Sequence, residues 1–284
     1  MRGLWRITGW PRRRRARLAL AAAERQVARF PTIATRRPHG LPGELVVSLT
    51  SYPARFPTLA KTLKCVLDQT VAPDRTILWL GHGDRGKLPA DVLDLQPQGL
   101  EIRDCDDLRS FTKIIPALDA FPDAFILTVD DDVAYDPRLI ETLVQGFDAA
   151  APSIVARRVH LAHVQNDGRL TPYRSWALNV ADTVDRGSCD ILFLTGVGGV
   201  LYPPRSLDPM VLDRERFGRL CPHGDDIWLF WMARRAGTVV RRVGDVRPVV
   251  NWTGSQEVAL MNENLLRDRN DVQIRAMEAE LGPA

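Results

Sequence analysis

The apolar positions between residues 44 and 150 fall into short runs, separated by longer segments in which apolar residues recur every three or four positions. The runs are rich in Val, Ile and Leu and end at turn-forming residues, which is typical of buried strands. They predict strands over Leu45–Leu49, Ile77–Leu80, Leu100–Asp104 and Phe125–Val129. The segments between them predict helices over Pro57–Leu67, Leu88–Leu95 and Thr112–Ala120. This alternation predicts an α/β fold with a mostly parallel sheet flanked by helices.

The second half of the chain is less regular. It predicts strands over Ile154–Ala156, Ile191–Leu194, Val239–Val243 and Val246–Val250, and helices over Asp225–Ala236 and Glu257–Leu281. Residues 1–43 differ from the rest of the chain, because they carry a run of arginines and end in the turn-rich sequence PHGLPG. We therefore expect a basic N-terminal extension and linker over residues 1–43 and one folded domain over residues 44–284, with a helical C-terminal tail.

The composition, with 45% hydrophobic and 26% charged residues, is that of an ordinary globular protein. The net charge of +3 comes from Arg12–Arg15 and Arg17. Because the body of the chain has no basic stripe with interleaved aromatic residues, we do not expect a nucleic-acid binder. The four cysteines are scattered, and no apolar run approaches the ~20 residues of a membrane span. We expect a cytoplasmic protein.

Aromatic and arginine side chains lie close together at the N-terminus, where Trp5, Ile7 and Trp10 precede the arginine run. Such a segment can lie on an anionic membrane surface. A poorly ordered leader explains the same composition. We therefore keep both a peripheral contact of residues 1–30 with the inner membrane and the leader as alternatives.

Three adjacent carboxylates, Asp130, Asp131 and Asp132, come directly after the predicted strand Phe125–Val129. Open α/β sheets place their ligands at such strand ends. Each close pair of carboxylates costs on the order of 4 kcal/mol at an effective dielectric constant near 20, so water or a cation must offset the repulsion. Carboxylates are hard ligands, and they predict Mg²⁺ or Mn²⁺ shared with a phosphate. A solvated acidic turn that caps the next helix is the alternative.

A second pair of carboxylates, Asp225 and Asp226, opens the predicted helix in the sequence CPHGDDIW. A helix N-terminus favours an ionised carboxylate, which suits a general base and equally an ordinary N-cap. Lys113, in a chain with few lysines, is positioned either to contact a diphosphate or to lie on a solvated helix face. Trp228 and Trp252 are candidates for a sugar-stacking face, although core packing is favoured for Trp228.

The stretch Val46–Gly83, VVSLTSYPARFPTLAKTLKCVLDQTVAPDRTILWLGHG, resembles the opening of family-2-like glycosyltransferases of the GT-A fold. Those enzymes begin with a strand, a Pro/Thr/Tyr turn, a helix with an S-V-L-x-Q-T sequence and a second strand; Cys65–Thr70 matches that sequence. Asp130–Asp132 then falls where they carry their D-x-D motif. The SLTSYPxR and DDD stretches look like those of a bacterial group that builds capsular or lipopolysaccharide chains.

The resemblance implies a role for each matching residue. Asp132 would be the first metal ligand, with Asp130 as a second. Asp130 and Asp131 would face the ribose and the donor sugar, or a water on the metal. In the turn Thr50–Arg55, Tyr52 would stack on the base and Arg55 would meet phosphate. Asp226, with Asp225 as the fallback, would deprotonate the acceptor hydroxyl of an inverting transfer.

Three functions remain open at this point. The first is metal-dependent transfer of a sugar from a nucleotide-diphosphate sugar to a glycan or lipid-linked acceptor. The second is nucleotidyl transfer to a sugar phosphate, which normally uses a glycine-rich loop near the first strand, and Leu49–Arg55 has no glycine. The third is a non-catalytic protein that binds sugar nucleotides. The second strand ends in Gly81–Asp84 where many relatives carry a base-reading Asp, so the base is not predicted.

Overall fold

The computed structural model describes residues 9–181, 190–255 and 268–284. Its centre is a seven-stranded sheet in the order β11-β7-β10-β6-β2-β4-β5. The strands in chain order are β2 (Leu45–Thr50), β4 (Arg75–Gly81), β5 (Leu100–Cys105), β6 (Phe125–Thr128), β7 (Ile154–Ala156), β10 (Val200–Tyr202) and β11 (Val240–Arg242). Within this sheet β10 is antiparallel to both neighbours and every other pairing is parallel. The predicted α/β class with a mostly parallel sheet is confirmed.

Both faces of the sheet are buried at its centre, which is why β2, β4 and β6 read as nearly continuous apolar runs. Leu45, Val47 and Leu49 pack into the core on one face, together with α2 (Phe56–Leu67), α3 (Ala90–Leu93) and α5 (Leu139–Gln145). Val46 points into the core on the other face. That core also contains residues of α4 (Ile115–Ala120), α6 (Arg214–Leu220), α7 (Asp225–Arg235) and α9 (Arg269–Leu281).

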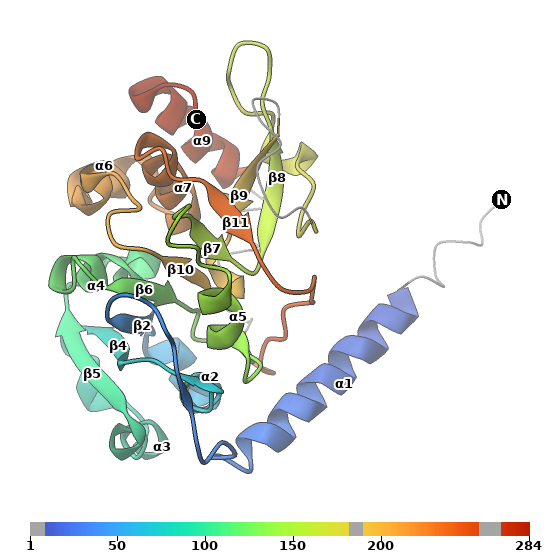
Figure 1. Ribbon diagram of the computed structural model, residues 1–284, viewed down its shortest axis with the longest axis vertical. Helices are drawn as coiled ribbons and strands as arrows, with labels where there is room; N and C mark the ends of the chain where they lie inside the picture. Colours follow the sequence, from blue (N-terminus) through green and yellow to red (C-terminus); the bar gives the residue numbers. More distant parts are fainter. Residues whose placement is uncertain (1–8, 182–189, 256–267) are drawn as a thin grey trace.

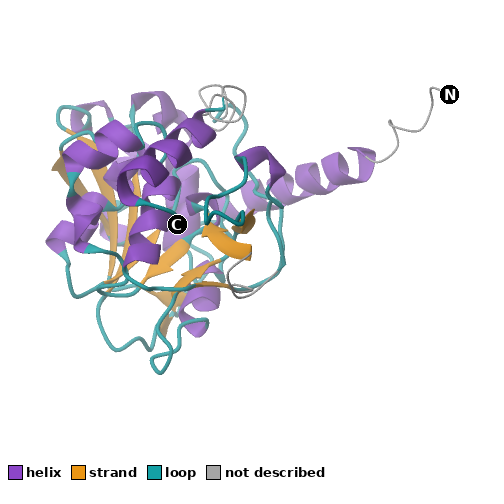
Figure 2. Ribbon diagram, turned by 90° about the horizontal axis from the view of Figure 1, so that it is seen from above, coloured by secondary structure: helices purple, strands orange, loops and turns teal. Residues whose placement is uncertain are grey.

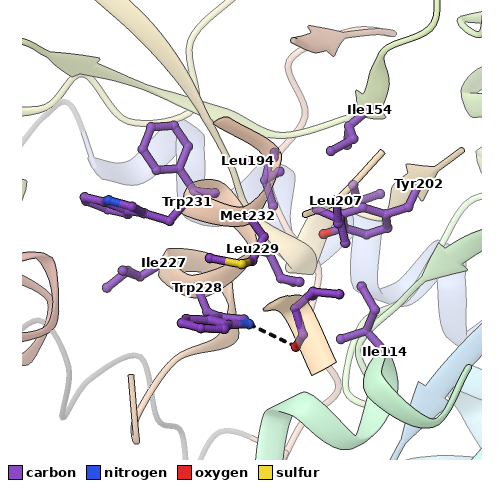
Figure 3. Close-up of a cluster of buried hydrophobic side chains, with 14 of the residues drawn as sticks. Ile114, Ile154, Leu194, Tyr202, Leu207, Ile227, Trp228, Leu229, Trp231 and Met232 are labelled. Atoms are coloured by element: carbon purple, nitrogen blue, oxygen red, sulfur yellow. Dashed lines mark hydrogen bonds between the residues drawn. The ribbon is translucent and has the colours of Figure 1, made fainter. Parts of the chain in front are cut away.

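Helix α7 lies at the centre of the core that contains Val46 (Figure 3). Trp228, Phe230 and Trp231 are at most 1% exposed, and Trp228 Nε1 donates to the Val211 carbonyl at 3.1 Å. A helix that is apolar on all sides must be enclosed by protein, and each large buried side chain contributes about 1.5–3 kcal/mol. The N-terminus of α7, where Asp225 and Asp226 lie, is therefore held firmly relative to the sheet.

Two smaller sheets complete the strands of the described residues. Strand β8 (Val159–His163) pairs in antiparallel fashion with β9 (Asp190–Leu194), and β1 (Arg37–Pro38) pairs in parallel with β3 (Val71–Ala72). Neither β8 nor β10 was predicted. Residues 257–267 of the predicted C-terminal helix lie outside the described residues, and α9 confirms its later part.

Two predicted elements are wrong. The helix predicted over Thr112–Ala120 is divided, with Lys113 ending a 3₁₀ turn (Arg109–Lys113) and α4 beginning at Ile115. Pro116 has no N–H to donate and is tolerated only in the first turn of a helix, so the helix starts anew there. The strand predicted over Val246–Val250 is absent from the structure, because Pro248 removes a donor and Val246 is 46% exposed.

Helix α1 (Gly9–Val27) projects away from the rest of the molecule in both views (Figures 1 and 2). Its later turns contact the body, where Glu24 forms an ion pair with Lys61 of α2 at 2.8 Å and Val27 packs against the core. Leu18 is 61% exposed. Trp5 and Ile7 lie outside the described residues. Among the described helices, none combines the length and the apolar character that crossing a membrane requires.

Candidate functional site

The carboxyl ends of β2 and β6 lie side by side, since Ser48 is in register with Thr128. The chain continues from β2 into the turn 51–55 and from β6 into Asp130–Asp132, so the two predicted donor-binding segments meet at one edge of the sheet. The Thr50 hydroxyl donates to the Trp79 carbonyl of β4 at 2.9 Å. Thr50 therefore fixes the start of the turn through a bond to the neighbouring strand.

Arg55 joins the turn to the acidic cluster. Its Nη1 donates to Asp132 Oδ2, and both side chains are buried. Its Nε lies 3.4 Å from the hydroxyl of Tyr52, which is 40% exposed. Burial by itself lowers the pKa of Arg55, but the Tyr52 hydrogen bond and the Asp132 charge raise it above its usual value. Arg55 thus stays charged and orients Asp132, while Tyr52 stays accessible.

Asp131 points toward the same turn, where the Ser51 hydroxyl donates to its Oδ2 at 2.5 Å. Burial raises the pKa of Asp131 to about 7, and the charge of Asp132 adds to this effect although the Ser51 bond opposes it. The buried surroundings of Asp131 therefore disfavour its ionised form. Ser51 was not among the predicted site residues, although it lies within the SLTSYPxR stretch.

Lys113 connects the acidic cluster to α7. Its Nζ lies 2.9 Å from Asp130 Oδ1 and 3.0 Å from Asp225 Oδ2, and its side chain is buried. Burial by itself lowers the pKa of Lys113, but Asp130, Asp225 and Asp226 raise it well above its usual value. The Lys113 carbonyl accepts from the Ser48 hydroxyl at 2.6 Å, which anchors the 3₁₀ turn on β2. The solvated helix face considered for Lys113 is thus excluded.

Asp226 is the second residue of α7 and is held by the turn 196–198. Its Oδ1 accepts from the Gly196 N–H at 2.9 Å. A Cβ atom at Gly196 would lie 2.8 Å from Lys113 Nζ and 3.3 Å from Asp226 Oδ1, so the backbone approaches closely only because this residue is glycine. Burial raises the pKa of Asp226 to about 7, and the charge of Asp225 acts in the same direction. Asp226 can therefore take up a proton near neutral pH.

Tyr135 connects the acidic cluster to the turn 196–198, called the glycine turn below, through two hydrogen bonds. Its hydroxyl accepts from the Asp130 N–H at 2.9 Å and donates to the Val197 carbonyl at 3.1 Å. Sequence reasoning assigned no role to Tyr135. Gly196 belongs to the sequence TGVGG at Thr195–Gly199. Nothing in that sequence indicates that the Gly196 N–H donates to Asp226.

The two tryptophans considered for sugar stacking are buried. Trp228 is enclosed by the core around α7, as favoured, and is 0% exposed. Trp252 is 1% exposed, and its Nε1 donates to Thr62 Oγ1 at 2.8 Å. Its N–H donates to the Asp132 carbonyl at 3.2 Å. The stacking role considered for Trp252 is therefore wrong; it supports the acidic cluster from behind.

The carboxylates of Asp130 and Asp132 are ligands of the kind that a hard divalent cation prefers. Asp130 and Asp132 supply carboxylate oxygens, and Mg²⁺ in proteins is usually held by one or two carboxylates together with phosphates and water. Among the described residues, no group of three or more His, Cys, Asp or Glu side chains is arranged to hold an ion by itself. The phosphates of a ligand would have to complete the coordination.

Comparisons with known proteins find solved structures that are similar to this chain, but they do not assign it to a family. No protein-family model matches the chain, and no curated protein matches it. A mannosyltransferase from Pyrobaculum calidifontis in complex with GDP-Man and Mn²⁺ is similar in structure, with 14% identity, a TM-score of 0.47 and coverage of 93% of this chain and 71% of that one.

Two further structures are similar at the same low level. A CMP:2-keto-3-deoxy-manno-octonic acid synthetase complexed with CTP has 13% identity and a TM-score of 0.43, covering 80% of this chain and 99% of that one. A 4-diphosphocytidyl-2C-methyl-D-erythritol synthase from Anaerococcus prevotii has 14% identity and a TM-score of 0.43, covering 80% and 97%. With TM-scores this low, none of these likenesses defines the chemistry of this chain, which rests on the residues of the site.

Proposed function

We propose that the chain is a divalent-metal-dependent, inverting glycosyltransferase that moves a sugar from a nucleotide-diphosphate sugar to a hydroxyl of a glycan or lipid-linked acceptor. The observation that carries the proposal is the position of Lys113 between Asp130 and Asp225. One buried cation joins the strand end that we assign to the donor to the helix start that we assign to the base. On this proposal, the cluster Asp130–Asp132 and the pair Asp225–Asp226 are parts of one site.

The donor half consists of the turn 50–55 and the acidic cluster. Tyr52 would stack on the base, and Arg55 and Lys113 would supply positive charge to the diphosphate. Thr50 shapes the turn, and Asp130 and Asp131 would contact the ribose and the donor sugar. Asp132 and Asp130 would hold Mn²⁺ or Mg²⁺, which when bound neutralises charge on the diphosphate leaving group. Because Arg55 already fixes Asp132, this half is ordered before the donor arrives.

The acceptor half is centred on Asp226. The acceptor oxygen would form a bond to the anomeric carbon while its proton passes to a carboxylate oxygen of Asp226. The bond from the anomeric carbon to the diphosphate oxygen would break, and its electron pair would leave with the nucleoside diphosphate. Attack on the face opposite the leaving group inverts the anomeric centre. General-base catalysis of this kind contributes about 10²–10⁴-fold to the rate.

A screen of thermal stability with nucleotide-diphosphate sugars, with and without Mn²⁺, tests the proposal. We expect one nucleotide sugar to raise the unfolding temperature, and to do so more with Mn²⁺. Formation of a nucleotide sugar and pyrophosphate from a nucleoside triphosphate and a sugar 1-phosphate would favour the nucleotidyltransferase. Stabilisation by a nucleotide sugar that is neither hydrolysed nor transferred would favour the non-catalytic protein.

We further propose that the enzyme acts in surface-polysaccharide biosynthesis at the cytoplasmic face of the inner membrane. The support is the resemblance of the SLTSYPxR and DDD stretches to bacterial enzymes of that kind, together with the projecting helix α1. The arginine run in α1 supplies the charge that anionic lipids attract.

A further inference from the structure

Arg158 lies between β7 and β8, directly before Val159, and contacts the segment that holds Asp226. Its Nη1 donates to Thr195 Oγ1 at 3.0 Å, and the Thr195 hydroxyl donates back to the Arg158 carbonyl at 3.1 Å. Thr195 precedes Gly196, whose N–H binds Asp226. Burial lowers the pKa of Arg158, an effect that the charge of Asp226 partly offsets. A positive charge is thus placed close to the proposed base.

Arg158 is half-buried and, within the described part of the chain, forms an ion pair with no carboxylate. Its neighbour Arg157 shows the usual arrangement, since Arg157 Nη1 lies 2.6 Å from Asp136 Oδ2. Removing a guanidinium from water without an anion costs free energy. Among the described residues, Arg158 therefore has no anionic partner for its guanidinium.

His160 of β8 adds a second donor at the same place. Its ring is buried, and its Nδ1 accepts from the Asn179 N–H at 3.0 Å. Burial and the charge of Arg158 lower the pKa of His160 to about 3, although a hydrogen bond with the Val159 backbone opposes them, so the ring is neutral. Because Nδ1 accepts, the single proton of the neutral ring lies on Nε2. That Nε2 lies 3.5 Å from Arg158 Nη1. Two donors face each other, and the oxygen that would accept from both is not supplied by the described residues.

We propose that Arg158 and His160 bind an oxyanion of the acceptor, a carboxylate or a phosphate, next to Asp226. The inference rests on the proposed function and names the chemical class of its acceptor. The guanidinium and the Nε2–H can both donate to one oxyanion, and bonds of this kind to a charged partner are the stronger ones. The Tyr173 ring packs edge-on against His160, with 5.9 Å between the ring centroids, and helps to fix the imidazole.

NMR of ¹⁵N-histidine-labelled protein tests the inference without donor or turnover. The probes are methyl β-D-glucuronide for a carboxylate, glucose 6-phosphate for a phosphate, and methyl β-D-glucoside as the neutral control. We expect the His160 signals to show the Nε2–H tautomer and to shift saturably with one of the two anions, but not with the neutral sugar. The anion that acts identifies the source of the charge.

Substitutions complete the test. We expect Arg158→Gln to weaken this binding at least tenfold and Arg158→Lys to weaken it less, since lysine keeps the charge without the fork. Arg247→Gln is the control, because it removes an exposed arginine that is already paired with Asp136 and Asp245. If Arg158→Gln does not fold, His160→Gln replaces it, with binding of the same anion measured by isothermal titration calorimetry and the same expected loss.

The inference is overturned if His160 carries its proton on Nδ1, if neither anion shifts the signals, or if the neutral sugar shifts them equally. It is also overturned if Arg158→Gln or its replacement binds as tightly as the wild type. None of these results bears on the proposed function. That function is tested separately by the nucleotide-sugar screen, which does not involve the acceptor.

Discussion

The Nζ of Lys113 lies 3.0 Å from Asp225 Oδ2, and this ion pair joins the 3₁₀ turn before α4 to the first residue of α7. The same Nζ lies 2.9 Å from Asp130. A buried cation between two carboxylates satisfies both, and its removal leaves two negative charges without compensation. The pair thus has consequences for both stability and activity.

Lys113→Gln should therefore destabilise the protein and weaken the binding of a nucleotide sugar. Breaking a buried ion pair by removing one partner costs about 3–5 kcal/mol, and the partial exposure of Asp130 places this case at the lower end. Urea unfolding and donor binding measure the two effects. Lys87→Gln is the control, since Lys87 forms an exposed ion pair with Asp84 and should change neither. Unaltered donor binding by a folded Lys113→Gln protein would remove Lys113 from the donor site.

Asp226→Asn should abolish turnover while raising stability at alkaline pH. The folded pKa of about 7 is above the value near 3.9 of an unfolded Asp, so the folded protein binds this proton more tightly. Stability is therefore lost as pH rises from about 4 to about 7, and Asn, which does not ionise, avoids the loss. We expect Asp226→Asn to be more stable than the wild type at pH 8 by a few kcal/mol, and equal to it near pH 4.

The rate of the wild type should follow the same group, with kcat/KM rising as pH increases through about 7, because only ionised Asp226 accepts a proton. The charged and titratable groups near Asp226 are Asp225, Lys113, Asp130, Tyr173, Tyr202 and Arg158. A rate that does not change between pH 5 and 8, together with near-normal turnover of Asp226→Asn, would place the base elsewhere.

Much of the fold was predictable because its signals are local. The strands β2, β4 and β6 are apolar on both faces, β5 alternates between apolar and polar residues, and α7 is apolar all round from Ile227 to Ala233, so short stretches of sequence identified each. Asp225 and Asp226 were placed at a helix start for the same reason. The break before Ile115 was missed because the apolar pattern of Thr112–Ala120 outweighed the single proline in the interpretation.

The contacts of the candidate site were less predictable because they join distant segments. Arg55 with Asp132, Lys113 with Asp225 and Gly196 with Asp226 meet only through the tertiary fold. The three-residue strand β10 is too short for periodicity to show, although it sets where the glycine turn lies. Trp252 was misjudged because an aromatic residue reads alike in sequence whether it is buried or exposed.

Gly196→Ala should reduce activity by displacing Lys113 and Asp226. The added Cβ would lie 2.8 Å from Lys113 Nζ, which is too close, so the Lys113 ammonium would have to move. We expect turnover to fall at least tenfold with a modest change in stability. Gly218→Ala is the matched control, because a Cβ there meets nothing within 4 Å and alanine favours the helix by about 0.5–1 kcal/mol. Equal activity of the two variants would mean that Gly196 has no part in the site.

The N-terminal segment should bind anionic membranes. Sedimentation with vesicles containing phosphatidylglycerol should recover the wild type, and less of a variant in which Arg12–Arg15 are replaced by glutamine, since each basic residue near the surface contributes roughly 1 kcal/mol. Neutral phosphatidylcholine vesicles and added salt provide the controls. Equal recovery of both proteins on anionic vesicles would favour the leader interpretation.

The central claim is that Asp130–Asp132 hold a metal-bound nucleotide diphosphate sugar whose sugar is then transferred. The most direct measurement is the product analysis of the nucleotide sugar selected by the thermal screen, incubated with Mn²⁺ or with chelator, for the wild type and Asp132→Asn. We predict release of the nucleoside diphosphate by the wild type only with the metal, and none by Asp132→Asn. Release of the nucleoside monophosphate, or equal release of the diphosphate with chelator or by Asp132→Asn, would contradict the claim.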